Sequence, residues 1–183
     1  ESELKKISIV DLSQLPILSK NELREFGTTT LIANKLEPKG EYFASSGSTG
    51  TPTKILFSYP MHQKWSAIFE ARIRHWAGVN IKTPRGMIGG RRVLPDASNK
   101  PPFYRYNFFE KQVYFSAYHI NATNAANYVH AINKYDLGYM TGYAMSNYFL
   151  ARFIKEEQLK VKELKAVITS SEKLTSEMRQ LFK

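Results

Sequence analysis

The stretch Ala44–Lys54, ASSGSTGTPTK, concentrates hydroxyl and glycine residues between two apolar segments. Glycines such as Gly47 and Gly50 allow backbone N–H groups to turn toward one centre, and the Ser and Thr hydroxyls add further donors. Lys54 then supplies a compact positive charge. These groups suit a polyphosphate, so the stretch is a candidate phosphate-binding loop. A flexible loop is the alternative that composition alone leaves equally open.

The loop is not a Walker loop, in which Gly-Lys-Ser/Thr directly opens a helix. Instead it joins two expected strands, at residues 41–45 and 54–59, whose apolar residues alternate. A plain hairpin would explain that arrangement. However, the connection is longer than the preferred hairpin loops and unusually rich in hydroxyls.

The composition limits the chemistry that the chain can perform. Its 183 residues are 43% hydrophobic and 13% aromatic, which is enough to build a core. It has no cysteine, which excludes disulfides, thiol catalysis and cysteine-ligated zinc. The first residues, ESELKKISIV, lack the apolar region of a signal peptide, and no apolar run approaches membrane-spanning length. We therefore expect a cytoplasmic protein with no membrane partner.

The net charge of +10 permits an anionic partner or a phosphate-rich ligand. It is equally compatible with a piece of a larger, better balanced protein. The basic residues are spread along the chain, and the densest pairs are Lys5–Lys6 and Arg91–Arg92. No helix shows the basic clustering that tracking of nucleic-acid phosphates needs, so we expect no nucleic-acid partner.

Strands alternate with helices along the chain. Ser19 and Glu22 fit a capping box that starts a helix near Lys20. Apolar residues spaced by three, four and seven predict a helix over 61–77 that buries its tryptophans and ends at Gly78. Further strands are expected at 112–118, 138–141 and 164–171, and the last of these is expected to be buried. Further helices are expected at 123–134, 144–157 and 174–182, and Thr175 caps the last one. Residues 95–106 are expected to form a Pro-rich aromatic loop.

This alternation predicts an α/β fold with a mixed sheet flanked by helices. We expect an N-terminal extended or helical segment over residues 1–40 and a partial binding domain over 41–183. The last helix runs directly into Lys183 without a capping glycine. We therefore expect the chain to stop within a fold.

The loop resembles the phosphate loop of adenylate-forming enzymes, the acyl-CoA synthetase superfamily. That family's pattern is Ser/Thr-Ser/Gly-Gly-Thr/Ser-Thr-Gly-x-Pro followed by Lys or Thr, and SSGSTGTPTK matches it. Thr53 stands where many members carry the Lys, and Lys54 follows one place later. Pro-Thr at this point is common in the branch that resembles phenylacetate–CoA ligase.

Further stretches resemble the same branch in the same order. LPILSKNELRE is similar to its N-terminal signature, and TGYAMSNYFLARFI is similar to its Gly-Tyr-Pro-Ser helix start, with Ala144 in place of the Pro. LKAVITSSEKLTSEMRQLF resembles the strand and turn that lead to the adenine-binding region. WAGV, GGR and YFSAYHI are typical of the CapK-type, capsular-polysaccharide-associated members. The resemblance runs from Leu15 to the end and implies an incomplete part of the family's large N-terminal domain.

The resemblance implies an acid–CoA ligase that binds ATP, Mg²⁺, coenzyme A and a small-molecule carboxylic acid. The family's Tyr-Gly-x-x-Glu motif for adenine and magnesium, its ribose-binding Asp and its catalytic Lys have no counterpart here. We therefore assign no catalytic residue and no metal ligand, and expect the isolated chain to be inactive. The acid and the oligomeric state stay open. A basic aromatic module that binds nucleic acid or an anionic saccharide is the alternative function.

The resemblance also implies roles for particular residues. The loop residues Ser46, Gly47, Ser48, Thr49 and Gly50, with Lys54, would hold the β- and γ-phosphates of ATP, and Ser171 and Glu172 would line adenine. The candidates for the acyl pocket are Arg91, His119, Gly142 and Tyr143. Each of the larger side chains has a simpler interpretation: a surface arginine, a strand-end histidine, a core or helix-capping tyrosine and, for Glu172, a turn carboxylate.

Overall fold

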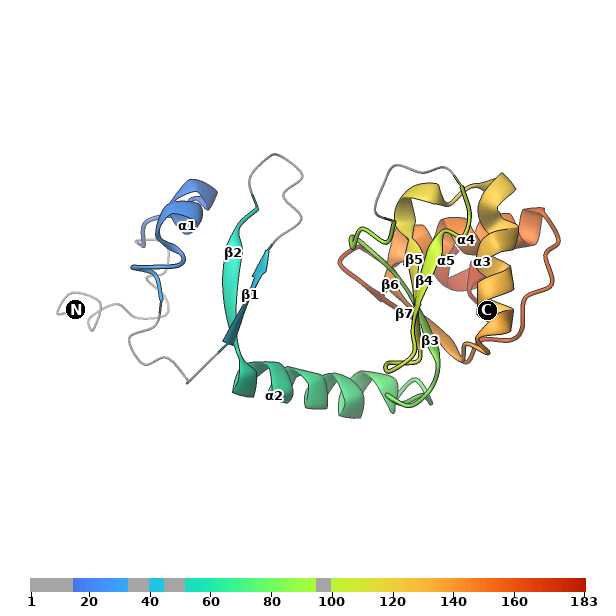
Figure 1. The fold of residues 1–183 in the computed structure, drawn as a ribbon, viewed down its shortest axis with the longest axis horizontal. Coiled ribbons are helices and arrows are strands. Elements are labelled where there is room, and N and C mark those ends of the chain that lie inside the picture. The colour runs from blue at the N-terminus through green and yellow to red at the C-terminus, as the bar shows by residue number, and fades with distance from the viewer. Residues whose placement is uncertain (1–14, 33–39, 45–51, 95–99) are drawn as a thin grey trace. The chain divides into compact units, whose positions relative to one another are not determined.

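The computed structural model describes residues 15–32, 40–44, 52–94 and 100–183 (Figure 1). The chain divides into two compact units, Glu1–Trp65 and Ser66–Lys183, and each is described by itself. Most of the candidate phosphate loop, residues 45–51, lies outside the described residues. The sequence-based division after residue 40 stays a prediction.

The first unit contains a short helix and a hairpin. Helix α1 (Lys20–Phe26) begins with the expected capping box, in which the Ser19 hydroxyl accepts from the Glu22 amide and the Glu22 carboxylate accepts from the Ser19 amide at 2.7 Å. Strands β1 (Gly40–Ala44) and β2 (Lys54–Ser58) pair antiparallel, with Ala44 opposite Lys54. Both strands beside the candidate loop are thus confirmed, and the loop joins neighbouring antiparallel strands.

The long helix after the hairpin is also confirmed, although its packing differs from the expectation. Helix α2 (Tyr59–Phe69) continues into a π-helical turn (Glu70–Arg74), and the chain turns away at Gly78, whose φ is +71°. The prediction that both tryptophans are buried was wrong, since Trp65 is 56% and Trp76 is 86% exposed. Apolar periodicity indicates an amphipathic helix, but it does not show that the apolar face is covered.

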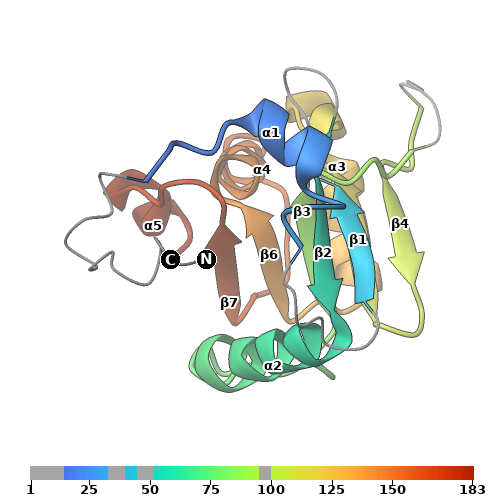
Figure 2. The same cartoon turned by 90° about the vertical axis from the view of Figure 1, so that its left-hand side faces the viewer.

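The second unit is built on a five-stranded mixed sheet in the order β4-β5-β3-β6-β7 (Figure 2). Strand β4 pairs antiparallel with β5, and the other strands run parallel. The bounds are β3 Arg85–Gly89, β4 Tyr104–Asn107, β5 Gln112–Ser116, β6 Tyr139–Tyr143 and β7 Ala166–Ser170. The helices are α3 Ala122–Lys134, α4 Ala144–Glu156 and α5 Ser176–Leu181, with a 3-10 turn at Ala117–His119. The mixed sheet flanked by helices confirms the predicted α/β class.

Both crossover connections, β5-α3-β6 and β6-α4-β7, advance across the sheet in the same direction. Right-handed crossovers of this kind place both helices on the same face, as Figure 2 shows. The main core lies between that face and the helices, and it includes Ile88, Phe115, Tyr128, Ile132 and Leu150. Gly86 belongs to it because a Cβ there would lie 2.3 Å from the Met140 sulfur.

Two expectations for this unit were wrong in part. Residues 104–107 form strand β4, where the sequence predicted the end of a loop. Strand β7 is half-buried, where a buried strand was expected, because it is the outermost strand of the described sheet. The helix cap at Thr175 is confirmed, since its hydroxyl accepts from the Met178 amide.

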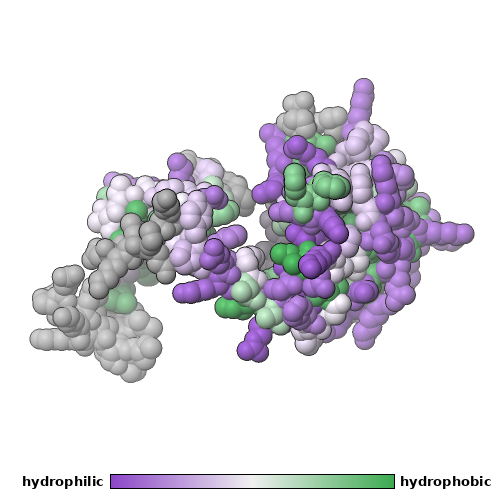
Figure 3. Space-filling model, turned by 60° about the horizontal axis from the view of Figure 1, so that its bottom comes forward, coloured by the Kyte–Doolittle hydropathy of each residue, from purple (hydrophilic) through white to green (hydrophobic). Residues whose placement is uncertain are grey.

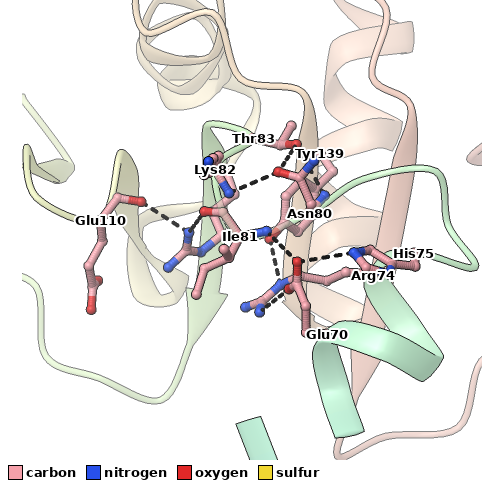
Figure 4. A network of polar contacts seen from close by, with 10 residues as sticks. Glu70, Arg74, His75, Asn80, Ile81, Lys82, Thr83, Glu110 and Tyr139 are labelled. Atoms are coloured by element: carbon pink, nitrogen blue, oxygen red, sulfur yellow. Dashed lines mark hydrogen bonds and ion pairs between the residues drawn. The ribbon is translucent and has the colours of Figure 1, made fainter. Parts of the chain in front are cut away.

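A polar network links the π-helical turn to the sheet (Figure 4). Arg74 forms an ion pair with Glu70 at 3.0 Å and donates to the Tyr139 hydroxyl on β6 at 3.0 Å. Glu70 also accepts from the Ile81 amide at 2.9 Å. Partial burial raises the pKa of Glu70, but the Ile81 amide and the Arg74 guanidinium outweigh it, so this pKa lies below the ordinary value of 4.5.

We expect Glu70→Gln to destabilise the protein by about 1–2 kcal/mol at neutral pH, since hydrogen bonds to a charged group are lost. A carboxylate whose pKa is lowered by folding stabilises the fold above its unfolded pKa and ceases to do so as pH falls through the folded value. The difference from wild type should therefore be constant at neutral pH and shrink below pH 4.5.

Urea unfolding from pH 7 to pH 3.5 measures this difference. Glu156→Gln is the matched control, because the ion pair of Glu156 with Arg152 is solvent-exposed and should contribute little. A Glu70→Gln effect that stays constant over the whole range would contradict the assigned network.

Candidate functional site

The parallel strands of the second unit end in register at one edge of the sheet. Gly89 pairs with Ser116, Ile88 with Gly142 and Tyr143 with Ser170. Open α/β sheets bind their ligands outside the carboxyl ends of the strands. The predicted site residues of this unit all lie at or just beyond these ends: Arg91, His119, Gly142, Tyr143, Ser171 and Glu172.

Gly142 has a structural reason to be glycine. Its φ is +125°, and a Cβ added to it would lie 1.8 Å from the carbonyl oxygen of Ile88 on the neighbouring strand. No L side chain fits that position without moving the backbone. Gly142 therefore sets the close approach of β3 and β6, and its predicted contact with a substrate stays a prediction.

Tyr143 connects the ends of these two strands. Its hydroxyl lies 2.5 Å from the place that a Cβ on Gly90 would occupy, so the ring closes over the segment that leaves β3. Tyr143 is also the N-cap residue of α4, where its side chain makes no capping hydrogen bond. Asn147, one turn into the helix, donates to the Tyr143 carbonyl at 2.8 Å.

Glu172 supplies the cap that Tyr143 lacks. Its carboxylate accepts from the Met145 amide in the first turn of α4, at 2.8 Å. Ser171 before it has φ +68°, which turns the chain after β7. A carboxylate at this position satisfies an unpaired helical amide and interacts favourably with the helix dipole. The structure shows Glu172 as a turn carboxylate that caps a neighbouring helix, and its place beside adenine stays a prediction.

His119 lies in the 3-10 turn after β5, with its ring held on one face and at one nitrogen. Nδ1 is 2.8 Å from the Ser116 hydroxyl, and the ring stacks on Phe103 at 4.8 Å between centroids. The buried Tyr128 donates to the Ser116 carbonyl at 2.7 Å, and burial raises the pKa of Tyr128. These contacts support the turn that carries His119.

Arg91 follows β3 and reaches back over the sheet. Its guanidinium lies 5.0 Å from the centre of the Tyr114 ring, a cation–π distance. Arg91 is exposed, as the surface interpretation requires, but its head group has a defined aromatic support. The structure thus fits both interpretations of this residue.

Of the candidate phosphate-binding residues, only Lys54 lies within the described ranges. It is exposed at the start of β2, in the first unit. Ser46, Gly47, Ser48, Thr49 and Gly50 lie outside the described residues, and their role stays a prediction. Among the residues that the structure describes, no group of three or more His, Cys, Asp or Glu side chains is arranged to hold a metal ion.

Two contributors to the site were not predicted from the sequence. Ser116 and Tyr128 carry no motif, yet together they support His119. The spacing of Ser116 and His119, three residues apart across a strand end, is a weak local indication of such contact. Tyr128 donates from a helix to a strand end, a contact that periodicity does not reveal.

The fold places this chain in the class of open α/β sheet proteins, and its parallel strands end at one common edge. No protein-family model matches the chain. It is 29% identical over 177 residues to Protein CapK of Staphylococcus aureus. The match covers 96% of this chain and 38% of the relative, so the chain spans well under half of that protein's length.

None of the described helices is long and apolar enough to cross a bilayer. Figure 3 shows hydrophilic side chains over much of the drawn face of the second unit, the right-hand body, with hydrophobic patches among them.

Substitution of Gly142 tests the close approach of β3 and β6. Gly142→Ala should destabilise the protein by roughly 3 kcal/mol or more, since it adds both a backbone clash and an unfavourable φ. Gly89→Ala is the matched control, because a Cβ there meets only the flexible end of Met87 at 3.4 Å. Thermal unfolding compares the two, and equal melting temperatures would contradict the assigned packing.

Substitution of Glu172 tests the helix cap. We expect Glu172→Ala to cost about 0.5–1 kcal/mol, and Glu172→Gln to cost less because an acceptor oxygen remains. Amide hydrogen exchange at Met145 gives a local readout, and it should accelerate in Glu172→Ala. Unchanged exchange in that variant would show that the carboxylate does not cap α4.

Proposed function

We propose that this chain is the ATP-phosphate-binding and acid-binding portion of an adenylate-forming, acid–CoA ligase-like enzyme. The observation that supports it best is the common edge at which Arg91, His119, Tyr143 and Glu172 lie, although they come from separate segments. The motifs select these residues without reference to the sheet. Their position at the carboxyl ends of parallel strands is where such a site is expected.

The proposed reaction has two steps. A carboxylate oxygen of the acid attacks the α-phosphorus of ATP, forming the acyl-adenylate while the bond to pyrophosphate breaks. The thiol of coenzyme A then attacks the acyl carbon, and AMP leaves. Such a transfer needs positioning and neutralisation of charge more than a covalent protein nucleophile.

Each segment of the chain has a part in binding. The hydroxyls and backbone amides of Ser46–Gly50 hold the β- and γ-phosphates, and Lys54 adds positive charge. The backbone around Ser171 lines adenine, while the Glu172 carboxylate keeps that turn attached to α4. His119 and Tyr143 lie at adjacent strand ends and line the space for the acid.

Magnesium ion would neutralise phosphate charge during the reaction. The described residues offer no cluster of ligands for it, so we assign no Mg²⁺ ligand to this chain and route no step through the metal. The catalytic lysine implied by the resemblance likewise has no assigned position here. We therefore expect the ligase activity to belong to a longer protein and the 183-residue chain to lack it.

The similarity to Protein CapK agrees with the branch to which the motifs point, the capsular-polysaccharide-associated members. A sugar-linked acid is accordingly one candidate substrate, beside aryl-acetates and other aromatic acids.

A basic aromatic binding module is the second candidate function. The stacking of Arg91 on Tyr114 favours it, since arginine and aromatic side chains together recognise anionic ligands. Salt-dependent binding of DNA or an anionic saccharide, with no response to ATP, would distinguish this function from the ligase.

The hydroxyls of the loop provide the test of the proposed function. In the full-length protein, Ser48→Ala with Thr49→Ala should lower acid-dependent pyrophosphate release from ATP by roughly 100-fold, since two donors to the phosphates are removed. The measurement is a screen of carboxylic acids for pyrophosphate release, repeated on the variant with the best acid.

Thr30→Ala is the matched control, an exposed threonine of the same unit outside the loop. It should retain full activity. Unchanged activity in the Ser48 and Thr49 variant would show that the loop does not bind the phosphates. Pyrophosphate release by the 183-residue chain alone would contradict the assignment of catalysis to missing elements.

A further inference from the structure

Three arginines line a groove on the second unit. The groove has a volume of about 440 Å³ and lies between the segment after β3 and the β4–β5 hairpin. Clefts of this size hold small molecules. The side chains that matter are Arg91, Arg92, Arg105 and Tyr114.

The hairpin places two of these side chains on the same face of the sheet. Arg105 on β4 pairs directly with Tyr114 on β5, and directly opposed residues of an antiparallel pair project from the same face. Arg91 approaches Tyr114 from the other side of the groove, with its guanidinium 5.0 Å from the ring centre. Tyr114 is fixed in turn, since its hydroxyl donates to Glu110 at 2.7 Å.

Three arginines give this groove its positive charge. Arg91, Arg92 and Arg105 are exposed, and none of them belongs to the ion pairs found among the described residues. One carboxylate, that of Glu110, lies beside Tyr114 and accepts from its hydroxyl. Guanidinium groups bind oxyanions in a bidentate manner, and an aromatic face packs against a flat ring. Together they suit an oxyanion that is attached to a ring.

The segment that leaves β3 connects the groove to the candidate site. Gly90 lies against the Tyr143 hydroxyl at the carboxyl edge, and the next residue, Arg91, lines the groove. Val93 is buried, at 4% exposure, and anchors the segment on its far side. When the reacting carboxylate of a ligand lies at the carboxyl edge beside Gly90, the next residue of the chain already belongs to the basic groove.

We infer that the groove selects acids that carry a second oxyanion, a carboxylate or a phosphate, on a ring. This inference rests on the proposed function, because only that function makes the bound acid a substrate. The groove itself recognises the ring-borne anion through Arg91 and Arg105, with Tyr114 as the support for the Arg91 guanidinium.

The test is direct binding to the full-length protein, measured by titration calorimetry with matched probes. The charged probe is 4-carboxyphenylacetate, and its neutral isostere is 4-carbamoylphenylacetate. A third probe, 4-(phosphonooxy)phenylacetate, distinguishes phosphate from carboxylate. We expect the charged probes to bind roughly 10- to 100-fold more tightly than the carbamoyl probe, the range of one charge-assisted hydrogen bond.

Arg91→Met and, separately, Arg105→Met should abolish that preference, while Arg91→Lys should retain part of it because an ammonium lacks the planar fork. Arg72→Met is the control, an exposed arginine outside the groove. Equal binding of the charged and neutral probes, or an unchanged preference in both methionine variants, would overturn the inference.

Pyrophosphate release separates the two proposals. Activity only with acids of a single charge, unaffected by Arg91→Met, would leave the ligase function standing and overturn the role of the groove. Arginine-dependent binding of the charged probes without any acid-dependent pyrophosphate release would support the groove and contradict the ligase.

Discussion

The close approach of β3 and β6 at Gly142 is the constraint on which the candidate site depends. The Gly142 backbone lies against the Ile88 carbonyl without room for a side chain. Because these central strands are in register, the segments that leave them meet, and the Tyr143 hydroxyl contacts Gly90. The geometry of the edge therefore follows from a backbone contact inside the sheet.

The outer part of the edge depends on a carboxylate. Glu172 joins the turn after β7 to the first turn of α4 through the Met145 amide. This contact has a consequence for ligand binding, since an amide of the α4 N-terminus is already occupied by the protein's own negative charge. We propose that phosphate binds at the hydroxyl-rich loop instead, and that adenine binds beside the backbone of the Ser171 turn.

Local patterns predicted most of the fold. The capping box at Ser19 and the cap at Thr175 are confirmed, since they depend on neighbouring residues. Strand β4 was missed because its residues follow a Pro-rich stretch and gain their conformation by pairing with β5. The exposed Trp76 was predicted as core because periodicity describes one helix and not its partners.

For the site, motifs predicted which residues lie at the carboxyl edge, but not what they contact. The partners of Glu172 and His119 are an amide in another helix and a hydroxyl at a strand end. Such contacts depend on how the strands are ordered across the sheet, which sequence spacing does not reveal. Arg105 and Tyr114 were not predicted for the same reason, since their register appears only once the hairpin is formed.

We propose that the loop and the carboxyl edge bind a nucleotide. Amide hydrogen exchange of the full-length protein, with and without ATP, tests it most directly. We expect slower exchange on ATP addition over residues 45–54 and 168–174, with no change in α3. An ATP response confined to other parts of the protein, with both of these segments unchanged, would contradict it.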